Sequence, residues 1–334
     1  MNAYLKKILH AFFSWPLLIY PLQETREDAL NKEEKLAFEN GLRIAKDYYH
    51  LEEGRDYNEI TEKVLQSDDT SQHFKQLILD SGRRFIVFSY PSDGFQVKGL
   101  LSFVPEPSTN PLLIFLRGGN RLHSLQDPAT DYLCIRNYTI ITTTYRGGVS
   151  EGTDEYGGND VNDVYNLMAY FPALQEKLDL HFQPSKIFML GASRGGMQAF
   201  LSLSRFTSLQ NMVHKAASLS GLLDMNECIL DREDMKEMFI DDFGLLPNVN
   251  EEEWIRRRNP LNAVADIRKD LPFLIIQGTD DQRVGLIEGY NMVSRLEENG
   301  NPVTYIEIPG GTHCLRNQKD RMDIIADWFE SETL

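Results

Sequence analysis

The sequence predicts an α/β fold, in which a doubly wound and mostly parallel sheet has helices on both faces. Short apolar runs alternate with helical patterns over most of the chain, and most of these runs end at glycine. Several runs are apolar throughout, as expected for strands that are covered on both faces of a parallel sheet. The length of 334 residues allows one large domain or two of ordinary size.

The first predicted part is a helical N-terminal extension, residues 1–84. The stretch 24–83 is polar and mostly helix-forming, and it lacks strand-like alternation. Before it, two lysines precede an apolar run over residues 8–22, which two prolines interrupt and which is too short to span a membrane. Small residues that would mark a cleavage site are missing after this run. We therefore favour a cytoplasmic location, with export through this signal-like segment as the alternative.

The second predicted part, residues 85–334, begins with a β-hairpin, because two strand-like runs flank the turn residues Asp93 and Gly94. Further apolar runs of strand length cover residues 112–116, 139–144, 186–190, 216–219, 273–276 and 303–308. Helices lie between them in the pattern. Apolar residues spaced by three and four predict a helix from about Val161 to Met168 and a C-terminal one from Met322 to Phe329.

The segment 224–258 interrupts the alternation of strands and helices. It is rich in charged residues and in Met, Leu, Ile and Phe. We predict that it forms a helical cap insertion, at about residues 225–262. Such a cap would lie over the carboxyl ends of the strands, where open α/β sheets bind their ligands.

Composition excludes several classes of protein. The hydrophobic fraction of 42% and the charged fraction of 25% are those of a globular chain. The net charge of −16 makes nucleic acid an unlikely partner, since binding to phosphates depends on Lys and Arg. Three scattered cysteines provide neither a disulfide framework nor a Cys-x-x-Cys zinc site. No metal or cofactor and no membrane-spanning segment are expected.

The strongest motif is Gly191-Ala192-Ser193-Arg194-Gly195, which directly follows a strand-like run and directly precedes a helical one. A nucleophilic serine on a tight turn from strand to helix needs small neighbours, because the turn is crowded and its backbone is strained. Gly191 and Gly195 meet that need. Ser193 is therefore the predicted nucleophile, with a glycine-rich structural turn as the alternative.

A serine hydroxyl is a weak nucleophile near neutral pH, so it needs a base, and the base needs an acid that holds its tautomer. In the α/β-hydrolase arrangement the order is serine, acid, histidine. Of the seven histidines, only His313 follows a strand beyond a candidate acid, and it is the predicted base. Asp280 and Asp281 both follow the strand 273–276, and chemistry alone does not separate them. Asp224 is a weaker rival.

Backbone N–H groups must also stabilise the negative charge of the transition state. One predicted donor of this oxyanion hole is the N–H of Arg194, and the second lies in the glycine-rich turn after the third strand, at Gly118 and Gly119. A plain Gly-Gly loop is the alternative for that turn. Arg117 and Arg194 are expected to place positive charge beside the site.

Four separated parts of the chain resemble the catalytic domain of the prolyl oligopeptidase family of serine peptidases. They are the hairpin 92–99, the turn 117–119, the segments 145–148 and 155–164, and the segments that carry Ser193, Asp281 and His313. The family pattern Gly-x-x-Asp-x-x-Val maps onto Gly278, Asp281 and Val284, so the resemblance makes Asp281 the preferred acid. Family members commonly have His in place of Gln277, and often His or Tyr in place of Arg117.

The resemblance covers roughly residues 85–334 and implies a serine peptidase that cleaves short peptides through an acyl-enzyme. A carboxylesterase or thioesterase with the same triad is the alternative, and a non-catalytic binding protein of the same fold is the third reading. A small peptide or ester is the expected partner, and the oligomeric state is left open. A gating propeller needs about 160 residues or more, so none is expected within residues 1–84. That extension and the cap are the candidate lids.

Overall fold

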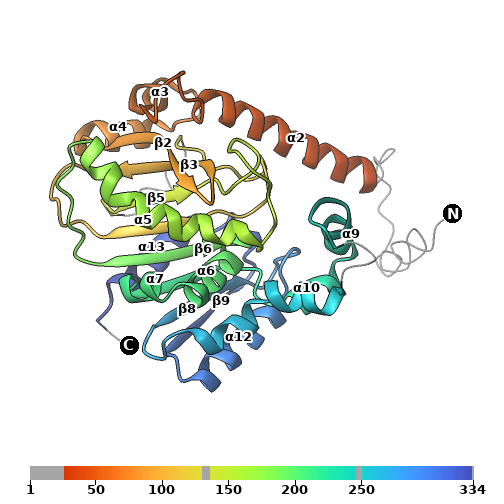
Figure 1. The fold of residues 1–334 in the computed structure, drawn as a ribbon. Helices are drawn as coiled ribbons and strands as arrows, with labels where there is room; N and C mark the ends of the chain where they lie inside the picture. The colour runs from red at the N-terminus through yellow and green to blue at the C-terminus, as the bar shows by residue number, and fades with distance from the viewer. Residues whose placement is uncertain (1–25, 130–135, 246–249, 333–334) are drawn as a thin grey trace. The chain divides into compact units, whose positions relative to one another are not determined.

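The computed structural model describes residues 26–129, 136–245 and 250–332, and it divides the chain into two compact units, residues 1–39 and 40–334. The second unit contains a nine-stranded sheet with helices on both faces (Figure 1). Five consecutive neighbour pairs, from β5 to β9, are parallel, and the pairs among the first strands and β5 are antiparallel. This confirms the predicted fold class.

The sheet has the strand order β1-β2-β3-β5-β4-β6-β7-β8-β9. The strands are β1 (Tyr57–Glu59), β2 (Arg84–Ser92), β3 (Phe95–Phe103), β4 (Leu112–Leu116), β5 (Thr139–Thr143), β6 (Ile187–Ala192), β7 (Lys215–Leu219), β8 (Phe273–Gly278) and β9 (Val303–Ile308). All eight predicted strands are present, and β2 and β3 form the predicted hairpin. Since β4 and β6 are central neighbours, the turns that follow them lie side by side at one edge of the sheet.

One strand was not predicted. The sequence pattern predicts helices over residues 24–83, but β1 lies within this stretch and pairs antiparallel with β2. Helices surround it in the chain: α2 (Arg26–Asp47), α3 (Thr61–Gln66) and α4 (Gln72–Ser81). Val64 and Ile78 of α3 and α4 share a buried cluster with Val87 of β2, so these elements are packed on the sheet. The division into domains at residue 84 stays a prediction.

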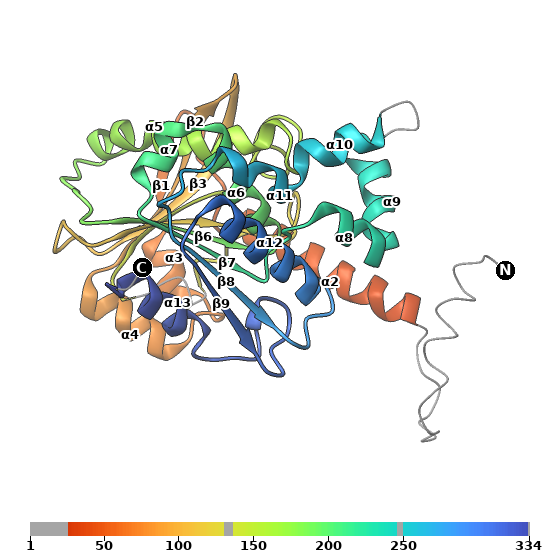
Figure 2. The same cartoon turned by 90° about the horizontal axis from the view of Figure 1, so that it is seen from below.

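Helices cover both faces of the sheet (Figure 2). One face packs against α5 (Asn162–Lys177), α6 (Arg194–Arg205), α7 (Thr207–Met212) and α12 (Leu286–Asn299). The other packs against α3, α4 and α13 (Arg321–Glu330), and in α13 Ile325 and Phe329 share a buried cluster with strand residues such as Phe188. The helices predicted from Val161 and from Met322 are α5 and α13. Strands buried on both faces account for their apolar runs.

Four short helices follow β7 where the cap was predicted: α8 (Met225–Asp231), α9 (Glu233–Asp242), α10 (Glu251–Arg258) and α11 (Pro260–Ala263). Phe239 of α9 and Trp254 of α10 share a buried cluster with Tyr156 and with Met197 of α6. The cap helices therefore pack directly over the start of α6, the helix that follows the nucleophile motif.

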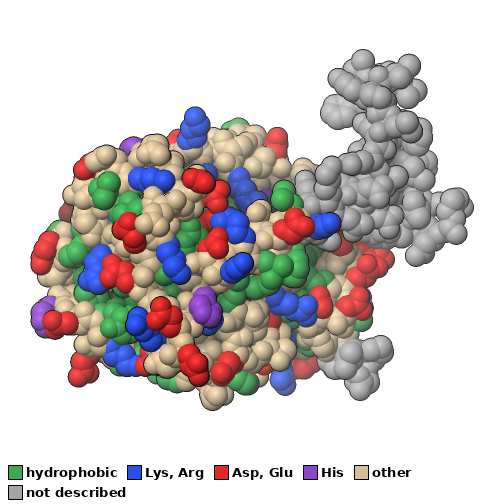
Figure 3. Space-filling view, turned by 90° about the horizontal axis from the view of Figure 1, so that it is seen from above, with side chains coloured by type: hydrophobic (Ala, Val, Ile, Leu, Met, Phe, Trp, Pro, Cys, Tyr) green, Lys and Arg blue, Asp and Glu red, His purple; other side chains and the backbone are tan. Residues whose placement is uncertain are grey.

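The predicted signal-like run, residues 8–22, lies outside the described residues. Within the part of the chain that the structure describes, no helix combines the length and the apolar character needed to cross a bilayer. On the face drawn in Figure 3, Lys and Arg side chains lie interspersed among Asp and Glu side chains. The acidic excess is therefore not gathered into one patch on that face.

Candidate active site

Ser193 lies on a sharp turn between β6 and α6. Its backbone has φ 54° and ψ −124°, a combination that residues with a side chain rarely adopt. Two hydrogen bonds to β7 and the loop after it hold Ser193 there, from the Ser193 N–H to the Leu219 carbonyl at 3.0 Å and from the Leu222 N–H to the Ser193 carbonyl at 3.0 Å. The turn presents the Ser193 hydroxyl at the carboxyl end of the sheet.

The structure brings Ser193, His313 and Asp281 together, although they come from three separate loops. His313 Nε2 lies 3.0 Å from Ser193 Oγ, and His313 Nδ1 lies 3.0 Å and 2.9 Å from the two oxygens of Asp281. With its hydrogen on Nδ1, the imidazole donates to Asp281, and Nε2 is left to accept the serine proton. This is the geometry that general-base activation of a serine requires.

The two rival carboxylates lie elsewhere. Asp280 is exposed, and its side chain accepts a hydrogen bond from the neighbouring Thr279 hydroxyl. Asp224 caps the N-terminus of α8 and accepts hydrogen bonds from the side-chain amides of Asn259 and Asn291. Neither forms a hydrogen bond with His313 among the described contacts, so the geometry favours Asp281.

Asp281 is held by its own turn as well as by His313. The N–H groups of Arg283 and Val284 donate to its Oδ1 at 2.8 Å and 3.0 Å. Burial alone would raise the pKa of Asp281, but the hydrogen bonds and the His313 charge outweigh it and hold that pKa below its ordinary value. The carboxylate therefore stays ionised beside the imidazole.

The predicted oxyanion turn lies against the nucleophile. A Cβ built on Gly118 would fall 2.9 Å from Ser193 Cβ and 3.4 Å from Ser193 Oγ. Only glycine allows the turn to approach this closely. Gly119 has a positive φ of 64°, and Arg194, the next predicted donor, begins α6 directly after Ser193. Arg194 thus directly follows Ser193 in the chain, Gly118 lies against it, and Gly119 is the next residue of the same turn.

The positive charge expected beside the site is not on its surface. The Arg194 guanidinium is fully buried, and its Nη2 pairs with Asp154 and Asp160 at 2.6 Å each. Arg117 is also buried. Both guanidinium groups belong to residues beside Ser193, as expected, but both are buried, and two carboxylates inside the protein balance the charge of Arg194. Sequence reasoning missed Asp154, and the only available signal was that a buried arginine needs an acidic partner.

His313 leads us to expect an alkaline pH dependence. Burial lowers the pKa of its imidazole, but hydrogen bonds to Asp281 and Cys314 and the Asp281 charge outweigh burial and raise the pKa to about 9. Only the neutral ring accepts the Ser193 proton, so kcat/KM should rise about tenfold per pH unit below that pKa and level off above it. A pH profile with an uncharged substrate measures this. A profile that is flat between about pH 6 and 9 would contradict it.

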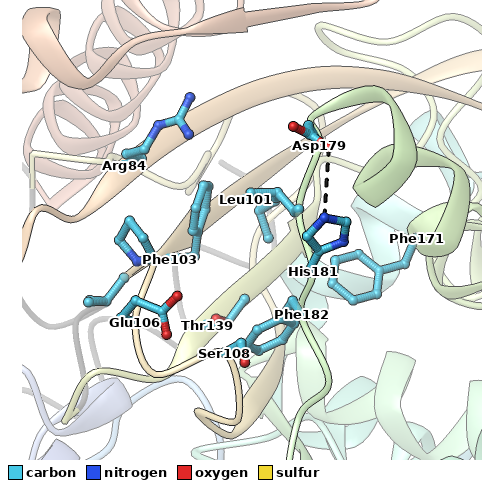
Figure 4. Close-up of a pocket in the computed structure, with 13 residues that line it drawn as sticks. Arg84, Leu101, Phe103, Glu106, Ser108, Thr139, Phe171, Asp179, His181 and Phe182 are labelled. Atoms are coloured by element: carbon cyan, nitrogen blue, oxygen red, sulfur yellow. Dashed lines mark ion pairs between the residues drawn. The ribbon is translucent and has the colours of Figure 1, made fainter.

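A cavity of about 280 Å³ lies at the opposite edge of the sheet (Figure 4). It is lined by the rings of Phe103, Phe171 and Phe182 and by Thr139, which begins β5. Parallel strands begin at one edge and end at the other, and Ser193 follows the end of β6. This cavity is therefore separate from the candidate active site.

Comparison with known proteins points to one family. The model of the prolyl oligopeptidase family matches residues 126–333, which is more than half of the chain. A Bacillus subtilis protein described as the uncharacterized peptidase YtmA is 25% identical over 252 residues, covering 74% of this chain and 94% of that protein. The acylamino-acid-releasing enzyme of Mus musculus is 24% identical over 250 residues, covering 69% of this chain. The match spans only 31% of the mouse enzyme's own length.

Solved structures share the fold. The acylaminoacyl peptidase of Pyrococcus horikoshii aligns with a TM-score of 0.61 at 19% identity, covering 74% of this chain and 42% of its own. Esterase B of Lactobacillus rhamnosis aligns with a TM-score of 0.58 at 13% identity, covering 91% of this chain and 93% of its own. Peptidases and an esterase thus share this architecture, and the fold by itself does not choose between their substrates.

Proposed function

Because this chain belongs to the prolyl oligopeptidase family, we propose that it is a serine peptidase that cleaves short peptides. In this proposal Ser193 is the nucleophile, His313 the general base and acid, and Asp281 the residue that orients His313. The observation that carries it is the continuous hydrogen-bonded chain from Ser193 Oγ through His313 to Asp281, at 3.0 Å and 2.9 Å.

The reaction follows from this geometry. Ser193 Oγ attacks the scissile carbonyl carbon while its proton passes to His313 Nε2, and the carbonyl oxygen becomes an oxyanion. When the tetrahedral intermediate collapses, His313 returns the proton to the leaving amine and an ester to Ser193 remains. A water molecule then attacks this acyl-enzyme with His313 again as base, which releases the acid and restores Ser193.

Backbone donors hold the oxyanion in this proposal. We assign the role to the N–H of Arg194 and to the peptide groups at Gly118, which lies against Ser193, and at Gly119, the next residue of the turn. Loss of one such donor typically lowers kcat by about 10²–10³-fold, so the turn contributes as much as a side chain.

The same machinery would also hydrolyse an ester. An esterase is the second candidate function, because esterase B shares the fold of this chain. Membership of the prolyl oligopeptidase family favours the peptidase. Several relatives are acylamino-acid-releasing enzymes, so N-acylated aminoacyl amides belong among the test substrates next to peptides with a free amino terminus.

Labelling with a fluorophosphonate probe tests the proposal. The wild type should be labelled, because the phosphonate reacts only with an activated serine, and the Ser193→Ala variant should not. Thermal melting of the variant provides the control that it is folded. Labelling that persists in Ser193→Ala would exclude Ser193 as the labelled nucleophile. Absence of labelling from folded wild type would exclude a Ser193 hydrolase and favour a binding protein.

A substrate panel then separates the two enzymatic functions. Aminoacyl and peptidyl amides, with free and acylated amino termini, are compared with short-chain and long-chain acyl esters. We expect turnover of amides that depends on Ser193. Turnover of esters alone would refute the peptidase and leave the esterase.

A further inference from the structure

Two buried arginines beside the oxyanion turn share contact with one tyrosine ring. The side chains of Arg117 and Arg194 belong to residues that are 2% and 0% exposed, and each Cζ is 5.1 Å from the centre of the Tyr145 ring. Neither guanidinium is open to solvent. They therefore do not bind a substrate from solution, and what they contact inside the protein defines their role.

Arg117 donates to four backbone carbonyls. It donates twice to that of Thr144, directly after β5, and the other three belong to residues 118–123, which include the oxyanion turn. Its Nη1 donates to the Gly118 carbonyl at 3.0 Å and to the His123 carbonyl at 2.9 Å, and its Nη2 donates to the Arg121 carbonyl at 3.0 Å. A single planar guanidinium thus holds three carbonyls of residues 118–123. A lysine has one nitrogen in place of this rigid fork, so it cannot hold all three in the same geometry.

The Arg194 side chain also hydrogen-bonds the oxyanion turn. Its Nη1 donates to the Gly119 carbonyl at 3.0 Å and to Asp154 at 2.9 Å. Asp154 in turn accepts the N–H of Arg121 at 3.0 Å. The residue after the nucleophile is thereby tied to both ends of the segment 119–121, directly and through one carboxylate.

The orientation of two consecutive peptide groups follows. In a planar trans peptide the carbonyl and the next N–H point in opposite directions. Because Arg117 donates to the Gly118 carbonyl, the Gly119 N–H of the same peptide group points away from Arg117. Because Arg194 donates to the Gly119 carbonyl, the Asn120 N–H points away from the Arg194 guanidinium. A flipped peptide would put a carbonyl where an oxyanion donor is needed.

We propose that Arg117 and Arg194 are positioning residues that lock the peptide groups of the oxyanion turn, so that its N–H groups are preorganised for the transition state. This inference rests on the proposed function, and it adds a role for two side chains that never contact substrate. Arg117 keeps the positive charge that strengthens its hydrogen bonds to these carbonyls, because burial lowers its pKa only to about 10 and the guanidinium stays charged near neutral pH.

Lysine variants test the inference with matched controls. Arg117→Lys is compared with Arg83→Lys, because Arg83 is another buried arginine, and it donates to Ser102 Oγ and the Tyr138 carbonyl. Arg194→Lys is compared with Arg146→Lys, because Arg146 is buried and paired with Asp163. All variants are assayed well below their own melting temperatures.

Two readouts are measured. The first is hydrogen–deuterium exchange in peptides covering residues 117–124, which needs no activity. Exchange there should become faster in Arg117→Lys and Arg194→Lys and stay at the wild-type rate in both controls. The second is steady-state kinetics, where kcat should fall about 10²–10³-fold with KM within a few-fold. The affinity for a peptide boronic acid, which forms a tetrahedral adduct, should fall by the same factor.

Wild-type exchange at residues 117–124 in Arg117→Lys and Arg194→Lys would overturn the inference. So would an unchanged kcat in the folded variants, or an equal loss of kcat in the two controls. Failure of the proposed function is distinguishable, because the wild type would then show neither turnover nor labelling of Ser193. In that case the exchange measurement still decides whether the two arginines hold the turn.

Discussion

Asp281→Asn is expected to lower kcat by about 10⁴-fold, whereas Asp280→Asn should leave it within about twofold of wild type. An amide at position 281 still hydrogen-bonds His313 Nδ1, but its NH₂ group favours the tautomer with the hydrogen on Nε2. That tautomer cannot accept the Ser193 proton. Asp280 forms no hydrogen bond with His313 among the described contacts, and its side chain is exposed, so we expect its substitution to leave the imidazole in place.

Steady-state kinetics on both variants measure the difference, and thermal melting supplies the control. Both substitutions are nearly isosteric, so the melting temperature of the Asp280→Asn protein reports how well the turn tolerates an amide. The assignment of Asp281 fails if Asp280→Asn causes the larger loss of kcat. It also fails if folded Asp281→Asn retains more than about a tenth of the wild-type kcat.

The meeting of Ser193, Asp281 and His313 could be predicted because parallel strands impose a simple geometry. Ser193 follows β6, Asp281 follows β8 and His313 follows β9, and the carboxyl ends of parallel strands meet at one edge of a sheet. Apolar runs located the ends of these strands in the sequence. The position of each residue just beyond such a run then placed the three side chains together.

The choice between Asp280 and Asp281 could not come from residue chemistry, because adjacent carboxylates differ only in direction. The direction is set by hydrogen bonds that close the turn after β8. Asp280 N–H donates to the Gly311 carbonyl, while Asp281 Oδ1 accepts the N–H groups of Arg283 and Val284. These contacts bring together segments distant in the chain, and no local pattern reports them.

Asp154 and β1 were missed for different reasons. Asp154 lies in a loop, and its role depends on two contacts, with the buried Arg194 side chain and with the N–H of Arg121, that only the folded chain creates. The strand β1 has three residues, of which none is fully buried, so it carries no apolar run. Its pairing with β2 supplies the structure that its composition does not indicate.

Gly195→Ala is expected to reduce the free energy of unfolding by more than about 3 kcal/mol. A Cβ built at this position would lie 1.9 Å from the Leu116 carbonyl oxygen and 3.0 Å from the Arg117 carbonyl oxygen. Both obstacles are backbone atoms at the end of β4, so no side chain can rotate away to relieve the clash. The first turn of α6 must instead move away from β4, which disrupts the close contact between Gly195 and the Leu116 carbonyl.

The same displacement would separate Ser193 from the oxyanion turn, because Ser193 directly precedes α6 and Gly118 follows β4. We therefore expect Gly195→Ala to lose fluorophosphonate labelling in whatever folded protein remains. Gly285→Ala is the matched control, since Gly285 has φ −71° and a Cβ there meets nothing closer than 3.6 Å. Its melting temperature should stay close to that of wild type, because alanine restricts the unfolded chain but is a poorer N-cap for α12 than glycine. A folded Gly195→Ala protein with a wild-type melting temperature would mean that α6 does not need this close contact with β4.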